Sequence, residues 1–109
     1  MDINELLDKA EELGWCIHED HEEWEFSQYS PAGEDFSFCV CTSDVNSPED
    51  LAREIRSYAN DFDAEEHTKM WVEAQGHVSG VPDIKTLVKD ADDIKLMLDK
   101  LASAMEDAL

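Results

Sequence analysis

Apolar residues recur with helical spacing at the start of the chain. Between residues 3 and 13 they stand three or four positions apart, and acidic residues fill most of the positions between them. Gly14 follows, and glycine is the residue that most often ends a helix. The pattern predicts an amphipathic helix whose apolar stripe is Ile3, Leu6, Leu7, Ala10 and Leu13.

Three short segments with a period of two come next. Each alternates a bulky apolar residue with a small or polar one, which is typical of antiparallel strands that are covered on one face only. The acidic segment 19–23 and the Pro-x-Gly sequence at 31–33 separate the segments as turns. The pattern predicts a three-stranded antiparallel meander whose bulky face is Trp15, Ile17, Trp24, Phe26, Phe36, Phe38 and Val40.

From Ser47 the spacing becomes helical again. Ser47 and Pro48 form a helix start signal, with an N-cap hydroxyl followed by proline in the first turn. Asp63 can cap a further helix, with Glu66 in the capping-box position. The residues with helical spacing in these two segments are Leu51, Ile55, Tyr58, Ala59, His67, Met70, Trp71 and Ala74.

The second of these helices is expected to stop near Gly76, before a loop at 77–82. Asp83 begins a periodic segment that continues to the C-terminus, either as one helix or as two helices broken around 90–93. Its apolar stripe is Ile84, Leu87, Val88, Ala91, Ile94, Leu98, Leu101, Met105 and Ala108. The whole chain, residues 1–109, is therefore predicted to be one α+β domain: an N-terminal helix, a meander, and three or four helices on one sheet face.

The charge of the chain is large, negative and unevenly placed. It has 28 Asp or Glu against 8 Lys or Arg, a formal net charge of −20. Residues 1–50 contain 15 acidic residues and one basic residue, whereas residues 51–109 contain 13 and 7. Solubility needs a net charge of only about 2–8, and a larger excess opposes compaction by self-repulsion. We interpret the excess as a sign of a cationic partner; the alternative is an acidic surface without a function.

Composition also excludes several classes of partner. Phosphate binding needs clustered cations, so direct binding to nucleic acid or to an anionic membrane is not expected. No segment approaches the roughly 18 apolar residues of a membrane span, and the sequence at 1–5 lacks the basic start of a signal peptide. We expect a cytoplasmic protein.

Cysteine and histidine provide the nearest approach to a metal-binding motif. Cys16, His18 and His21 have the spacing of a zinc ligand set, but structural zinc sites usually combine two such sets. The second set would have to come from Cys39 and Cys41, which are predicted on the same sheet face as Cys16. Small buried thiols are more common than metal ligands, so no metal and no cofactor is expected.

Other chemical motifs are weak. Asp61, Asp63 and Glu65 alternate as in a calcium loop, but the glycine and the final glutamate of an EF-hand are missing, which favours helix capping by Asp63. Glu66 and His67 could form an acid–base pair. The chain lacks nucleophile-elbow, phosphate-loop and metalloprotease motifs, and its acidic surface is unsuited to stabilising an oxyanion, so a non-catalytic protein is expected.

Several segments resemble a family of small acidic proteins from bacterial mobile elements and bacteriophages. They are Tyr29-Ser30-Pro31-Ala32-Gly33-Glu34-Asp35-Phe36, Glu54-Ile55-Arg56, Asp61-Phe62-Asp63, Glu66-His67, Met70-Trp71 and Gly80-Val81-Pro82. In size and charge the chain is also similar to anti-CRISPR and antirestriction DNA mimics, which fill the nucleic-acid channel of a nuclease with carboxylates. This resemblance implies an inhibitor in the host bacterial cell whose partner is a basic nucleic-acid-processing protein, a CRISPR (Cas) effector or a restriction enzyme.

The acidic turns are the predicted partner-binding surface, because turn tips lie beyond the helices that cover the sheet. The predicted residues are Glu19, Asp20, Glu22, Glu23, Glu25, Glu34, Asp35, Asp61 and Glu65. Two alternatives remain open at this stage. One is a metal-binding or enzymatic domain that uses Cys16, His18 and His21, and the other is an acidic adaptor that pairs through the stripe of its last helical segment.

Overall fold

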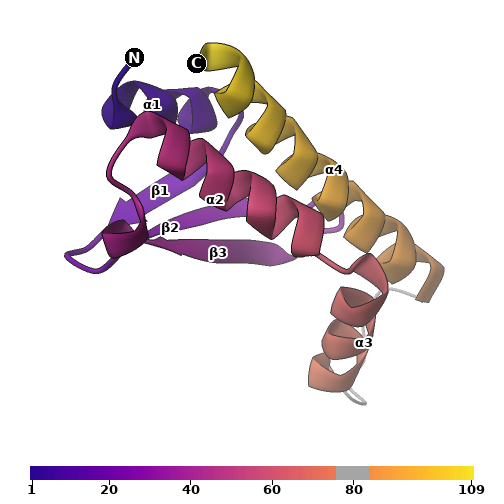
Figure 1. The fold of residues 1–109 in the computed structure, drawn as a ribbon. Helices are drawn as coiled ribbons and strands as arrows, with labels where there is room; N and C mark the ends of the chain where they lie inside the picture. Colours follow the sequence, from indigo (N-terminus) through magenta and orange to yellow (C-terminus); the bar gives the residue numbers. More distant parts are fainter. Residues whose placement is uncertain (76–83) are drawn as a thin grey trace.

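The computed structural model describes residues 1–75 and 84–109 as four α-helices, three β-strands and one 3₁₀ turn (Figure 1). The elements are α1 (Ile3–Glu12), β1 (Cys16–Glu19), β2 (Glu23–Tyr29), β3 (Asp35–Cys41), η1 (Thr42–Asp44), α2 (Pro48–Asp61), α3 (Ala64–Gln75) and α4 (Ile84–Ala108). The predicted α+β class and element order are confirmed. The predicted stop near Gly76 and the loop at 77–82 lie outside the described residues.

Local signals in the sequence set the boundaries of α1. The Asp2 carboxylate accepts the Glu5 backbone N–H at 2.9 Å, which satisfies one of the free N–H groups of the first turn. Gly14 has φ +96°, a conformation that costs glycine little, and it turns the chain from α1 into β1. A Cβ at this position would also stand 2.5 Å from the Gln28 side chain. Because the Gln28 amide is the flexible end of a side chain and can move, it is the backbone conformation that requires glycine here.

The three strands form an antiparallel sheet in the order β1-β2-β3. Phe26 pairs with Phe38 and Glu25 with Cys39, so apolar residues meet on one face and polar residues on the other. The aromatic and aliphatic residues of β2 and β3 on this face are at most 7% exposed: Trp24, Phe26, Phe36, Phe38 and Val40. Gln28, opposite Phe36, is half-buried at the end of the face. The predicted meander and its bulky face are confirmed.

Helices α2 and α4 lie side by side across the apolar face of the sheet, and α1 packs near the C-terminal end of α4 (Figure 1). The Ser47 hydroxyl accepts the Asp50 N–H at 3.2 Å, so the predicted N-cap of α2 is confirmed. α4 is one helix of 25 residues, which decides between the one-helix and two-helix predictions. None of the described helices, α4 included, is long and apolar enough to cross a lipid bilayer.

Helix α3 packs on α4 and projects beyond the sheet (Figure 1). The Asp63 carboxylate accepts the Glu66 N–H at 3.1 Å, so the predicted cap of this helix is confirmed. Leu13 (39%), a predicted stripe residue at the C-cap of α1, is exposed rather than buried. So are three residues of the stripes predicted for α3 and α4: Met70 (59%), Ile84 (64%) and Val88 (48%). The sheet does not reach this end of the helices, and Ile84 and Val88 instead border a groove of ≈ 400 Å³ between α3 and α4.

Candidate functional site

The sheet face that points away from α2 and α4 is polar and acidic. Strand alternation places ten side chains there, all of them exposed or half-buried. They are Cys16 and His18 of β1, Glu23, Glu25, Ser27 and Tyr29 of β2, and Asp35, Ser37, Cys39 and Cys41 of β3. We call these ten residues the open face. No large aliphatic side chain is among them, so nothing in this face requires cover by another element of the chain.

The turn between β1 and β2 adds carboxylates at one end of the open face. The Asp20 Oδ1 atom accepts the backbone N–H groups of Glu22 at 2.7 Å and Glu23 at 2.9 Å. These hydrogen bonds hold the pKa of Asp20 below its ordinary value, because they stabilise the carboxylate form. Glu19 and Glu22 are exposed beside it. The predicted residues of this turn therefore do form one acidic cluster.

The other predicted residues lie at the opposite end of the sheet. β2 and β3 are seven residues long, so about 20 Å separates the two ends. Asp35 and Asp61 are exposed at this end. Glu34, by contrast, forms a pair with His67. Glu65 pairs with Lys69 on the side of α3 that faces α4. The predicted set is therefore divided into two clusters, with Glu25 between them on the open face.

Basic residues are segregated from the sheet. All eight Lys and Arg residues lie within the four helices. In the part of the chain that the structure describes, six of these eight form an ion pair with a carboxylate on a helix. Residues 13–47, by contrast, contain eight acidic residues and no Lys or Arg: Glu19, Asp20, Glu22, Glu23, Glu25, Glu34, Asp35 and Asp44. Only histidines are available there as counter-charges.

The three thiols share the open face, as predicted, but they are exposed rather than buried. Partial desolvation and then the charge of Glu23 raise the pKa of the Cys39 thiol. Cys16 and His18 alternate with Ile17 along β1, while His21 lies in the turn. Among the residues that the structure describes, no three Cys, His, Asp or Glu side chains come together in a way that could hold a metal ion.

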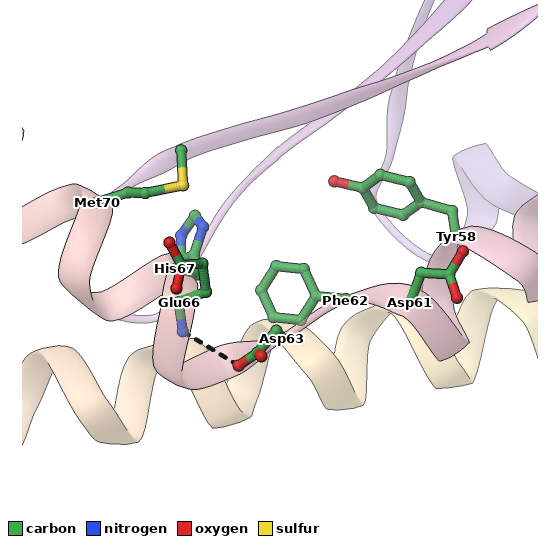
Figure 2. A pocket seen from close by; sticks show the side chains of 7 residues that line it. All are labelled: Tyr58, Asp61, Phe62, Asp63, Glu66, His67 and Met70. Atoms are coloured by element: carbon green, nitrogen blue, oxygen red, sulfur yellow. Dashed lines mark hydrogen bonds between the residues drawn. The ribbon is translucent and has the colours of Figure 1, made fainter.

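A cavity of ≈ 300 Å³ lies where α2 meets α3 (Figure 2). Its lining residues are Tyr58, Asp61, Phe62, Asp63, Glu66, His67 and Met70. The Tyr58 ring is half-buried against Phe38, with ring centroids 4.5 Å apart, and burial raises the pKa of its hydroxyl. Tyr58 and Trp71, which the spacing first suggests as core residues, are both only partly buried.

His67 forms a partly buried pair with Glu34. Its Nε2 atom lies 2.8 Å from Glu34 Oε2, and the side chains are 18% and 20% exposed. Phe36 and Phe62 pack on the imidazole at centroid distances of 5.7 Å and 5.3 Å. The partner of His67 is thus Glu34 rather than its chain neighbour Glu66. Sequence spacing gives no signal for this pair, because 33 positions separate the two residues.

A second long-range contact anchors the β2–β3 turn to α4. Asp90 is 2% exposed, and its carboxylate accepts the Ser30 hydroxyl at 2.6 Å and the Ala32 N–H at 2.9 Å. Because Ser30 Oγ also accepts the Glu34 N–H at 3.0 Å, Asp90 fixes the turn that presents Glu34 to His67. The buried Asp90 carboxylate therefore positions the β2–β3 turn and is not itself part of the exposed surface.

Comparison with known proteins finds no matching family, no matching characterised protein and no matching solved structure. The resemblance to small acidic proteins of mobile elements therefore stays a prediction.

Proposed function

We propose that this protein is a non-catalytic binding protein whose open face and β1–β2 turn bind the basic, nucleic-acid-binding groove of a partner. The partner class that fits is a bacterial defence nuclease, a CRISPR effector or a restriction enzyme, and binding would exclude nucleic acid from the groove. The observation that carries the proposal is the segregation of charge. Helix carboxylates neutralise most of the cations locally, whereas the sheet region has acidic residues without a Lys or Arg.

The spacing of the carboxylates supports this proposal. Glu23 and Glu25 are two residues apart on one strand, which separates them by about 6.6 Å along the open face. One nucleic-acid strand carries a charge per 3.4 Å or so of helix axis, so two such steps cover about the same distance. A groove lined with Lys and Arg for phosphates would therefore meet carboxylates at a comparable interval.

A binding role is also favoured over catalysis at the His67–Glu34 pair. The residues that line the adjacent cavity include no Ser, Cys, Lys or Arg. Ser and Cys are common nucleophiles, and Lys and Arg commonly stabilise anionic intermediates. An imidazole between two aromatic rings, paired with a carboxylate, is well suited to holding α3 against the sheet.

Charge reversal on the open face tests the proposal. The double variant Glu23→Lys/Glu25→Lys should bind a partner found in a panel of bacterial defence nucleases at least about tenfold more weakly than the original chain. Asp8→Lys/Asp107→Lys is the matched control, because it changes the net charge equally at exposed helix positions. Equal losses in the two variants would contradict a role for the sheet. Glu22→Lys, tested alone and together with Glu23→Lys, examines the turn in the same way.

Salt dependence and competition provide a second readout. Electrostatically steered complexes gain mainly in association rate, and the Debye length falls from ~8 Å at 0.15 M salt to ~3 Å at 1 M. Binding should therefore weaken steeply with salt, and nucleic acid should leave the target as the protein binds. Gel-shift titrations at two salt concentrations measure both effects. A stable ternary complex, or binding that barely responds to salt, would contradict the proposal.

A further inference from the structure

The cavity at the α2–α3 corner combines an apolar floor with a carboxylate rim. Tyr58, Phe62 and Met70 provide aromatic and thioether surface, and Asp61 and Glu66 stand at its edge (Figure 2). The Asp63 carboxylate lies beside Phe62 but is used by the N-cap of α3. The cavity therefore offers both ring surface and negative charge within one ≈ 300 Å³ volume.

Two of the rim carboxylates are uncompensated. Asp61 and Glu66 are exposed, and neither carboxylate has a hydrogen bond or an ion pair with any residue that the structure describes. This is unlike Glu106, which pairs with Arg56 at 2.8 Å. A cation that entered the cavity would therefore not have to displace a basic side chain of this protein.

The cavity continues as a groove along the edge of the sheet. A second cavity of ≈ 230 Å³ shares Tyr58 and Asp61 with the first and extends beside β3 to Asp44 and Glu54. β3 is an edge strand, which leaves part of its backbone free to pair with an extended segment. The described residues that line the two cavities include no Lys or Arg. The groove thus fits an extended, basic stretch of polypeptide rather than a compact ligand.

We propose that this groove binds a basic segment of the partner and that the α2–α3 cavity holds one arginine side chain of that segment. The inference deepens the proposed function, on which it rests for the identity of the partner, and it places a second contact outside the open face. Arginine suits the cavity better than lysine. Its planar guanidinium stacks on aromatic rings while it donates to carboxylates, and its aliphatic stem can cover apolar surface.

Short peptides test the cavity without the partner. The probe is a blocked heptapeptide, Gly-Ser-Gly-Arg-Gly-Ser-Gly, and its binding is followed by amide chemical shifts of the ¹⁵N-labelled protein. We expect the largest shifts at Tyr58, Phe62 and Glu66. A lysine peptide should bind at least about threefold more weakly, and a citrulline peptide, which keeps the shape of arginine without its charge, at least about tenfold more weakly.

Variants separate the cavity from general charge. Asp61→Asn/Glu66→Gln should weaken binding of the arginine peptide about tenfold, and Phe62→Leu should remove the preference for arginine over lysine. The control Asp8→Asn/Asp107→Asn removes the same charge elsewhere and should leave binding unchanged. Equal binding of the arginine and citrulline peptides, or shifts confined to the open face, would overturn the inference. If those results occurred while Glu23→Lys/Glu25→Lys still weakened partner binding, the proposed function would stand and this contact would not.

Discussion

The two faces of the sheet carry opposite chemistry although the same three strands build both. On the inner face, Phe26 and Phe38 stack at a centroid distance of 5.0 Å, and Tyr58 of α2 stacks on Phe38 in turn. On the open face, the residues directly adjacent in the chain, Glu25 and Ser27, face away from the helices. Because side chains alternate along a strand, one short sequence supplies both the core and the candidate binding surface.

The comparison indicates where a strongly charged protein can place its excess charge at least cost. Carboxylates on the open face are surrounded by water, which screens their mutual repulsion, so the inner face can hold the aromatic and aliphatic core. The helices follow a different principle, since they hold all the Lys and Arg residues, and six of these eight pair with a helix carboxylate among the described residues. We infer that stability depends on the inner face and that the open face is free to serve recognition.

Substitutions at neighbouring positions of β2 should show the largest difference between the faces. Phe26 is 0% exposed, and Phe26→Ala should lower the free energy of unfolding by about 3–5 kcal/mol, through lost burial and an unfilled cavity. Ser27→Ala on the open face should change it by less than about 0.5 kcal/mol. Urea denaturation followed by circular dichroism measures both. Similar losses would mean that the open face is covered by something other than water.

The next effect concerns the end of the sheet that α4 anchors. Asp90→Ala leaves the Ser30 hydroxyl and the Ala32 N–H without their acceptor and should cost about 2–4 kcal/mol. Asp92, two positions along the same helix, is exposed, and Asp92→Ala is the matched control, with an expected change below about 0.5 kcal/mol. A double-mutant cycle with Ser30→Ala should give a coupling energy of about 0.5–3 kcal/mol. Zero coupling would show that the contact does not stabilise the turn.

Most of the fold could be predicted from the sequence because its signals are local. The period-two segments, the Ser47 N-cap and Gly14 each specify a backbone conformation without reference to distant residues. Periodicity overestimated burial at Leu13, where α1 ends, and at Met70, Ile84 and Val88, where the helices extend beyond the sheet. An apolar stripe identifies which side of a helix is apolar. Whether another helix or the sheet covers that side depends on where those elements end.

The candidate site could be predicted only in part, and for a related reason. The acidic turns and the shared face of the thiols follow from strand alternation, so both were predictable. His67 and Glu34 are separated by 33 positions in the sequence, and Asp90 is separated from its two partners by 58 and 60 positions. Neither residue type nor spacing specifies such distant pairs. The cavity at the α2–α3 corner was also missed, since its walls come from the relative placement of two helices.

A smaller effect should come from the repulsion between carboxylates on the open face. Glu25 lies opposite His18 and Cys39 and two positions from Glu23. Glu25→Lys should therefore raise the free energy of unfolding by about 0.3–1 kcal/mol at low salt, and 1 M NaCl should remove most of this gain. Thermal unfolding at the two salt concentrations measures the effect. A gain that persists at 1 M NaCl would point to packing rather than charge.

The smallest effect is chemical, and it probes the electrostatic field of the open face at one atom. The thiolate of Cys39 is disfavoured first by desolvation and then by the negative charge of Glu23, so the pKa of the thiol is raised and less thiolate is present at neutral pH. Glu23→Gln removes the charge at nearly constant volume. It should therefore speed alkylation of Cys39 by iodoacetamide severalfold at pH 7.5, as measured by peptide mass spectrometry.

Two controls separate this charge effect from other causes. The alkylation rates of the two proteins should converge at a pH well above the thiol pKa, where the thiolate is complete in both. They should also be equal in 6 M guanidinium chloride. Because the sheet region lacks Lys and Arg, added salt should speed the reaction of the original chain and leave the variant less affected. Equal rates at pH 7.5 would show that Glu23 does not influence this face, and the electrostatic distinction between the two faces would then have to rest on the remaining carboxylates.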